Sequence, residues 1–170
     1  MYATLKLTSV VALVALWFAV GTPSWTADDA AALAAALKNA TATLQGGLKA
    51  SEREGTPISA KFEIEDGKLQ LSVYTLKDNN FMEVVADPKT GVISEAEKIK
   101  DADDLKAATA QKSAMAKAKV PLLTATETAV KANPGSQAVS IYPQLQSGQA
   151  VAEVTLLQGT VLKKVTERLD

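Results

Sequence analysis

The sequence predicts an α+β protein built from two copies of one α-β-β-β unit. Residues 48–93 and 129–169 repeat the same order of an amphipathic helix followed by three β-type runs with tight turns between them. Within the runs, apolar and polar residues alternate, which is the period of a half-buried strand. Alanine-rich segments with high helix propensity stand before and between the copies. Each unit is therefore expected to be a three-stranded antiparallel meander covered by a helix.

The N-terminal segment, residues 1–27, is expected to be a secretory signal peptide. It has one lysine, Lys6, followed by an uninterrupted apolar run of eleven residues, Val10–Val20. Eleven helical residues rise only about 16 Å, whereas the hydrocarbon core of a bilayer is about 30 Å thick. The run therefore fits a signal peptide better than a membrane span, and we expect a periplasmic or secreted bacterial protein.

The position of signal cleavage has two candidates in the sequence. Ala27 is the natural last residue of the signal, but Trp25 is large for the −3 position. Cleavage after Ala19-Val20-Gly21 is the alternative, and an uncleaved anchor also stays open. Once the signal is removed, no stable membrane span is expected.

Residues 28–97 are expected to hold a helix and the first unit. Thr26-Ala27-Asp28-Asp29 has the form of a capping box, and the alanine-dominated helix that it opens is expected to cover residues 28–44. Gly46-Gly47 is expected to bend or break this helix. A second helical stretch is expected over residues 43–54.

The strands of the first unit follow from alternation and from turn residues. Residues 58–64 and 69–74 alternate on either side of Asp66-Gly67, which is a strong hairpin signal. The third strand, Phe81–Ala86, is expected to end at the turn Asp87–Gly91, where proline sets φ and glycine accepts a positive φ.

Residues 98–170 are expected to hold a second helix and the second unit. A charged connector over 94–106 leads into a helix over 101–119, with acidic residues first and lysines late. An amphipathic helix, Leu122–Ala132, is ended by Asn133-Pro134-Gly135. Strands are then expected over 139–145, 150–157 and 160–165. Pro143 favours an edge strand or a bulge for the first of them.

The composition excludes several kinds of site. The chain has no histidine and no cysteine, so it has no Ser-His-Asp or Cys-His nucleophile system, no thiolate or imidazole zinc site and no disulfide. Its formal net charge is −1 and its lysines are interspersed with acids, which argues against nucleic-acid binding. We expect a protein that is not an enzyme, with no catalytic, cofactor-binding or metal-ligating residues.

Two acidic motifs have a functional and a structural interpretation. Asp87 with Thr90-Gly91 is a candidate ligand or cation site, but the favoured interpretation is a carboxylate that caps its own turn. The Asp101, Asp103 and Asp104 cluster is explained more simply by a helix N-terminus than by a metal. Met82 and Met115 are too sparse for a copper-handling methionine motif.

Two tyrosines and the last strand are candidates for partner contact. Tyr74 and Tyr142 fall on or near outward strand positions, although partial packing under a helix is the favoured interpretation. The last strand would be a sheet edge and would accept an extended peptide by β-augmentation. Lys163 and Lys164 on this strand also resemble charges that protect an edge against pairing, and both interpretations stay open. No partner-binding residue is assigned.

These motifs resemble the PepSY domain family, in tandem. In the first copy, Glu83–Gly91 is similar to the family's strand that ends in Val-Asp-x-x-Thr-Gly. In the second, a helix ending near Asn133-Pro134-Gly135 is followed by Ala152-Glu153-Val154, at the place of the family's Tyr-Glu-Val strand. Leu71-Ser72-Val73 occupies that place in the first copy. The second copy reaches Asp170 without a Thr-Gly turn, so it is degenerate or truncated.

The resemblance implies a non-enzymatic binding module of the bacterial envelope. PepSY-like domains occur in propeptides of thermolysin-type metallopeptidases, so the implied partner is a protein or peptide, with a peptidase as the leading candidate. The alternative is a structural or self-assembling envelope protein with no peptidase partner. A small-ligand or metal carrier is the third and least favoured hypothesis. The oligomeric state stays open.

Overall fold

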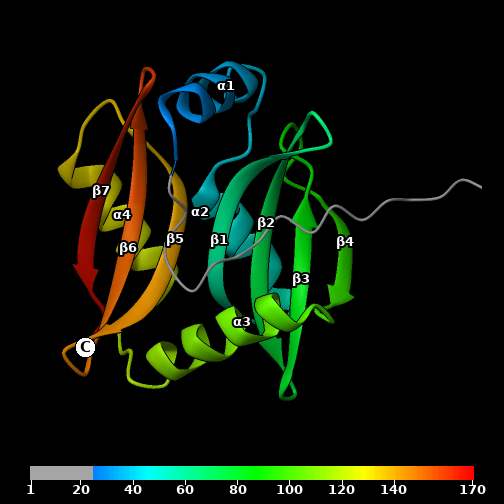
Figure 1. Ribbon diagram of the computed structural model, residues 1–170, viewed down its shortest axis with the longest axis vertical. Helices are drawn as coiled ribbons and strands as arrows, with labels where there is room; N and C mark the ends of the chain where they lie inside the picture. The colour runs from blue at the N-terminus through cyan, green and yellow to red at the C-terminus, as the bar shows by residue number, and fades with distance from the viewer. Residues whose placement is uncertain (1–24) are drawn as a thin grey trace, which may run out of the picture.

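The computed structural model describes residues 25–170, which form four α-helices and one seven-stranded sheet (Figure 1). The signal peptide expected over residues 1–27 lies almost entirely outside the described residues. The helices are α1 (Ala27–Leu37), α2 (Leu44–Ser51), α3 (Ala102–Met115) and α4 (Leu122–Ala132), and a 3-10 turn (Glu52–Glu54) follows α2. The strands are β1 (Thr56–Glu65), β2 (Lys68–Lys77), β3 (Asn80–Ala86), β4 (Ile93–Lys98), β5 (Gln137–Gln146), β6 (Gln149–Gln158) and β7 (Val161–Arg168).

The two units are joined into a single antiparallel sheet. Its strand order is β4-β3-β2-β1-β5-β6-β7, so each unit contributes a meander and the first strands of the two units meet at the centre. The seam between β1 and β5 is short, with Ala60 opposite Ile141 and Lys61 opposite Ser140. The predicted α+β class with two helix-plus-meander units is confirmed, and β4 and β7 form the outer edges.

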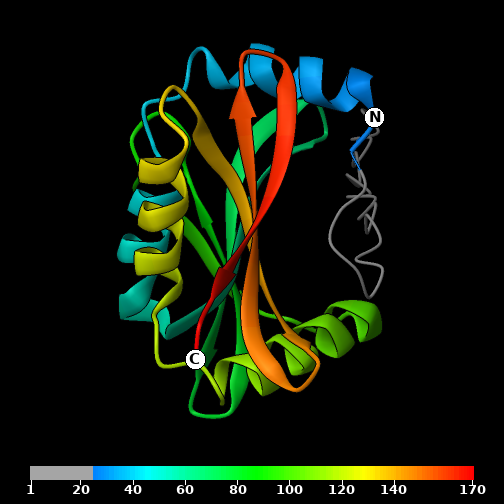
Figure 2. The same ribbon diagram turned by 90° about the vertical axis from the view of Figure 1, so that its left-hand side faces the viewer.

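The helices cover the two faces of the sheet unequally. Figure 2 shows α2 and α4 together on one face, α3 on the opposite face and α1 across one end. The main hydrophobic core lies under α2 and α4 and combines side chains of both units, including Leu48, Phe62, Leu122, Ile141 and Val154. Most of the alanines of α1 and α3 bury little area, so this shared core is the chief source of apolar stabilisation.

The first helix ends earlier than its alanine content predicts. Thr26 caps α1 with the predicted capping box, but α1 stops at Leu37 instead of continuing to Leu44. The N–H groups of Thr41 and Ala42 both donate to the carbonyl of Pro88 at 3.0 Å. These bonds hold Thr41 and Ala42 against the turn after β3, so the backbone here is not helical although the alanine content before it favours a helix.

Gly46 and Gly47 do not break a helix, contrary to the prediction; they lie inside α2. Thr43 caps α2 by accepting the Gly46 N–H at 3.0 Å. A Cβ atom at Gly47 would overlap the side chain of Leu71, which is fully buried on β2. The missing side chain of Gly47 therefore lets α2 pack directly against the sheet.

Replacing Gly47 with alanine is expected to destabilise the fold by about 1–3 kcal/mol, because the overlap with Leu71 exceeds the roughly 1 kcal/mol gained in helix propensity. Gly46→Ala is the matched control. Its Cβ would meet only the Thr43 hydroxyl, at 3.3 Å, so stability should stay level or rise. Urea unfolding of both variants checks this. Equal stability of the two would contradict the close approach of α2.

The first meander has a fourth strand where a charged connector was expected over 94–106. Asp87–Gly91 forms a hairpin turn, in which the Gly91 N–H donates to Asp87 and the Asp87 N–H donates to the Val92 carbonyl. The returning chain pairs with β3 as β4. β4 is exposed along almost its whole length, so it carries charges without the apolar alternation that marks a half-buried strand.

The second unit follows the prediction closely. α4 spans Leu122–Ala132 as expected, with Pro121 as its N-cap. β5 is an interior strand, which corrects the edge placement suggested by Pro143, and its bulge lies between Ala138 and Ser140. Pro143 is tolerated because the pairing of β5 with β1 ends at Ile141, before the proline.

Candidate functional site

The Asp87 turn has the structural role that the sequence favours. One oxygen, Asp87 Oδ1, accepts the N–H of Lys89 at 3.0 Å, the N–H of Thr90 at 2.8 Å and the Thr90 hydroxyl at 2.9 Å. These three donors stabilise the ionised carboxylate and lower the pKa of Asp87. The motif is therefore a capped turn, as predicted.

The second acidic motif caps α3. Asp101 Oδ1 accepts the N–H of Asp103 at 2.9 Å and of Asp104 at 3.1 Å. Asp104 turns instead towards the sheet, where it accepts a hydrogen bond from Tyr74. Within residues 25–170, no group of three acidic, histidine or cysteine side chains is arranged to hold a metal ion.

Tyr74 and Tyr142 do not form a contact surface. They are only 3% and 7% exposed, which confirms the packed alternative. Both lie on the face of the sheet opposite α2 and α4. Burial, with the negative charge of Glu83 for Tyr74 and of Glu63 for Tyr142, holds the pKa of each phenol well above its usual value.

Polar side chains line this same sheet face, a feature that the sequence analysis did not single out. Lys61 and Glu63 form an ion pair on β1, and Glu63 Oε1 accepts the Ser72 hydroxyl at 2.7 Å. On the far side of the seam, Lys164 pairs with Glu153 at 2.8 Å. The period-2 pattern places these residues on one face, but only the sheet order brings the two units' charges into one row.

Glu83 has the most perturbed carboxyl group of this face. Burial raises the pKa of Glu83 to about 7, and the negative charge of Glu63 adds to the shift, while Lys61 opposes it. The neutral form is therefore favoured in the folded protein far above the pH at which an unfolded chain ionises.

The stability of the protein is expected to fall as pH rises from about 4.5 to 7. The unfolded chain loses the Glu83 proton first, so the folded state binds more protons throughout this window. Glu83→Gln should remove much of this pH dependence. The free energy of unfolding of the variant should exceed that of the wild type by about 2 kcal/mol at pH 8 and equal it at pH 4. Urea unfolding across pH checks this, with Glu127→Gln on the exposed side of α4 as control. A wild-type slope retained in Glu83→Gln would contradict the assignment.

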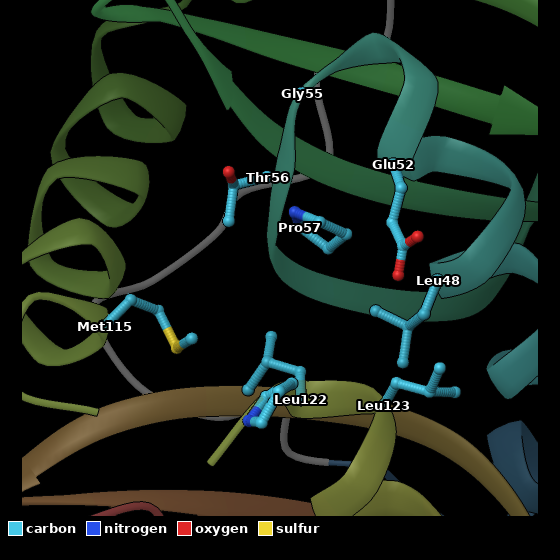
Figure 3. Close-up of a pocket in the computed structure, with 9 residues that line it drawn as sticks. Leu48, Glu52, Gly55, Thr56, Pro57, Met115, Leu122 and Leu123 are labelled. Carbon is cyan, nitrogen blue, oxygen red and sulfur yellow. The ribbon is translucent and has the colours of Figure 1, made fainter. Parts of the chain in front are cut away.

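An apolar pocket lies between the two units (Figure 3). It has a volume of about 280 Å³ and lies where α2 ends, β1 begins and α4 starts. Leu48, Met115, Leu122 and Leu123 face it, and the Glu52 carboxylate points towards it. Glu52 also pairs with Lys49 at 2.7 Å. Sequence reasoning missed this pocket because its walls come from segments far apart in the chain.

A second hollow of about 400 Å³ lies beside α1. One wall is the alanine-rich side of α1 with Lys38, and the other contains Leu157 and the turn at Gly159. Gln137 and Thr160 also line the hollow, so its polar groups come from the ends of its walls and the middle is formed by small alanine side chains.

The outer edge at β7 is a further surface open to contact. The Leu169 N–H donates to the Ala150 carbonyl at 2.9 Å, just past the end of β7. In an antiparallel ladder, the residues whose backbone groups face the neighbouring strand alternate with those whose groups face away. The outward backbone groups of β7 therefore belong to Leu162, Lys164, Thr166 and Arg168.

Comparison with known proteins identifies the first unit. The family described as "Peptidase propeptide and YPEB domain", PepSY, matches residues 28–97. Residues 28–97 are a PepSY domain. Apart from one residue at each end, this range contains α1, α2 and the four strands β1 to β4.

The other comparisons add little beyond this PepSY assignment. A crystal structure of a candidate lipoprotein from Clostridium difficile 630 is similar at 15% identity, with 71% of this chain and 88% of that chain covered and a TM-score of 0.34. No curated protein matches the chain. Among residues 25–170, none of the helices has the length and apolar character needed to cross a membrane.

Proposed function

We propose that this protein is an exported, non-enzymatic PepSY module that binds a protein or peptide partner in the bacterial cell envelope. The PepSY match over residues 28–97 carries the proposal, because the family is described through peptidase propeptides. A propeptide acts by occupying a surface of its peptidase and needs no catalytic residues of its own. A peptidase is therefore the first partner to test.

The arrangement of the second unit supports a tandem PepSY architecture. It repeats the order of a helix and an antiparallel meander, and its first strand joins β1 across the seam. The pocket beside Leu48 and Leu122 takes its walls from both units, so it exists only in the joined molecule.

Export through an N-terminal signal peptide is part of the proposal. The capping box at Thr26 and the packing of Trp25 against the core favour cleavage before these residues. Cleavage after Gly21, the shorter alternative, leaves both intact, whereas cleavage after Ala27 removes the cap, a loss of about 1 kcal/mol.

Affinity capture from envelope extract tests the function. The mature chain is tagged at its N-terminus, and bound proteins are identified by mass spectrometry. Recovery of a peptidase that the purified protein then inhibits would support restraint of a peptidase. A specific envelope protein that is not a peptidase would support binding without peptidase control. Capture of the chain alone, with a size that grows with concentration in light scattering, would favour the self-assembling alternative.

A further inference from the structure

We infer that the β7 edge binds an extended segment that is acidic on one face and apolar on the other. This inference rests on the proposed binding function and names the surface and the chemistry of the partner. The β7 edge is defined as strand Val161–Arg168, which is paired on one side only, with β6. Figure 1 shows β7 at the margin of the sheet.

The backbone of β7 offers a regular row of hydrogen-bonding groups. The outward N–H and C=O groups recur at every second residue, and Thr166, at the middle of the row, has an exposed side chain. An extended segment added here would pair with these groups and become an eighth strand of the sheet.

The two faces of β7 differ in character. On the polar face of the sheet, Lys164 and Arg168 flank Thr166, because Lys164 lies opposite Thr155 and Thr166 lies opposite Glu153. Lys164 already pairs with Glu153 and Arg168 with Asp170, and their ammonium and guanidinium side chains stay 41% and 70% exposed. Acidic side chains of an added strand would stand directly beside them.

The opposite face of β7 carries two valines that alternate with Lys163 and Glu167, and Lys163 is held by Asn133 at 2.8 Å. Val161 is 68% exposed, and Val165 lies on the same face, opposite Val154 of the core. Apolar side chains of an added strand would stand beside Val161 and Val165. An alternating sequence, acidic at one position and apolar at the next, therefore matches both faces at once.

The other outer strand, β4, does not fit this partner. Glu95 and Glu97 lie on its polar face, opposite Val85 and Glu83, where they would repel the acidic side chains that Lys164 and Arg168 attract. The charge difference between the two edges therefore predicts that an acidic strand binds at β7 and not at β4. The β4 edge provides a matched control within the same sheet.

Fluorescence anisotropy with labelled peptides of alternating valine and glutamate, or valine and lysine, tests the inference in the whole mature chain. Thr166→Pro removes an outward N–H without touching the β6 ladder, and Ala96→Pro does the same at β4. The glutamate peptide should bind the wild type and Ala96→Pro with equal affinity and bind Thr166→Pro about tenfold more weakly. Its affinity for the wild type should fall as the salt concentration rises. Thermal melts establish that both proline variants fold.

Three results would overturn the inference: no binding of the glutamate peptide, equal binding of the lysine peptide, or equal binding to both proline variants. If Thr166→Pro fails to fold, the double variant Lys164→Gln with Arg168→Gln replaces it. Loss of both positive charges should weaken binding of the glutamate peptide by about tenfold. The capture experiment separates this inference from the proposed function. A partner retained by Thr166→Pro would place the function on another surface, whereas the absence of any partner would remove the function itself.

Discussion

The first unit alone, residues 25–100, is expected not to fold. In the whole chain, α2 packs against α4, and the core beneath them draws on β1 and β5 together. Removing the second unit exposes Leu48 and Phe62, which are almost fully buried in the intact protein. A fragment of this length buries a smaller share of its surface than the whole chain does, so we expect that it cannot also lose half of a common core.

Far-UV circular dichroism and thermal unfolding of the fragment check this expectation. The fragment should lack the cooperative transition of residues 25–170, and mixing it with residues 101–170 should restore part of the native signal. A fragment that melts cooperatively by itself would show that the PepSY domain has a sufficient core of its own.

Phe62→Ala is expected to cost about 3–5 kcal/mol, the range for a fully buried phenylalanine truncated to alanine. Phe62 lies on β1, opposite Leu71 of β2, and is 2% exposed. The change would leave a cavity at the strand that joins the two units, where neighbouring side chains are held by both meanders and cannot easily close it.

Urea unfolding measures this cost, and Ile64→Ala is its control. Ile64 lies two residues further along the same strand and on the same face, but it is 37% exposed. Its truncation should cost about 1 kcal/mol or less. Similar losses for the two variants would contradict the placement of the core at the seam.

Local features of the fold were predictable from the sequence. Asp66-Gly67 and Asp87–Gly91 fix turns through their own backbone preferences, and Leu122–Ala132 shows a helical period that tertiary contacts do not override. These signals depend on neighbours in the chain. The α+β class and the repeated unit follow from them.

Features that depend on contacts between distant segments were not predictable in this way. The end of α1 depends on bonds from Thr41 to the Pro88 carbonyl, and the tolerance of Gly47 in α2 depends on the position of Leu71. β4 was not predicted because an outer strand exposes both faces, so its sequence is charged and lacks the alternation of apolar and polar residues. The pocket, the polar row and the charge of the β7 edge also required the strand order, which periodicity alone does not determine.

Site-specific photocrosslinking in cells tests the central claim that this protein binds a partner through the β7 edge. A photoreactive residue is placed at Thr166 in one strain and at Ala96, on β4, in another. We predict a discrete crosslinked product from position 166 and none from position 96. The absence of any product at position 166, or the same product from both positions, would contradict the claim.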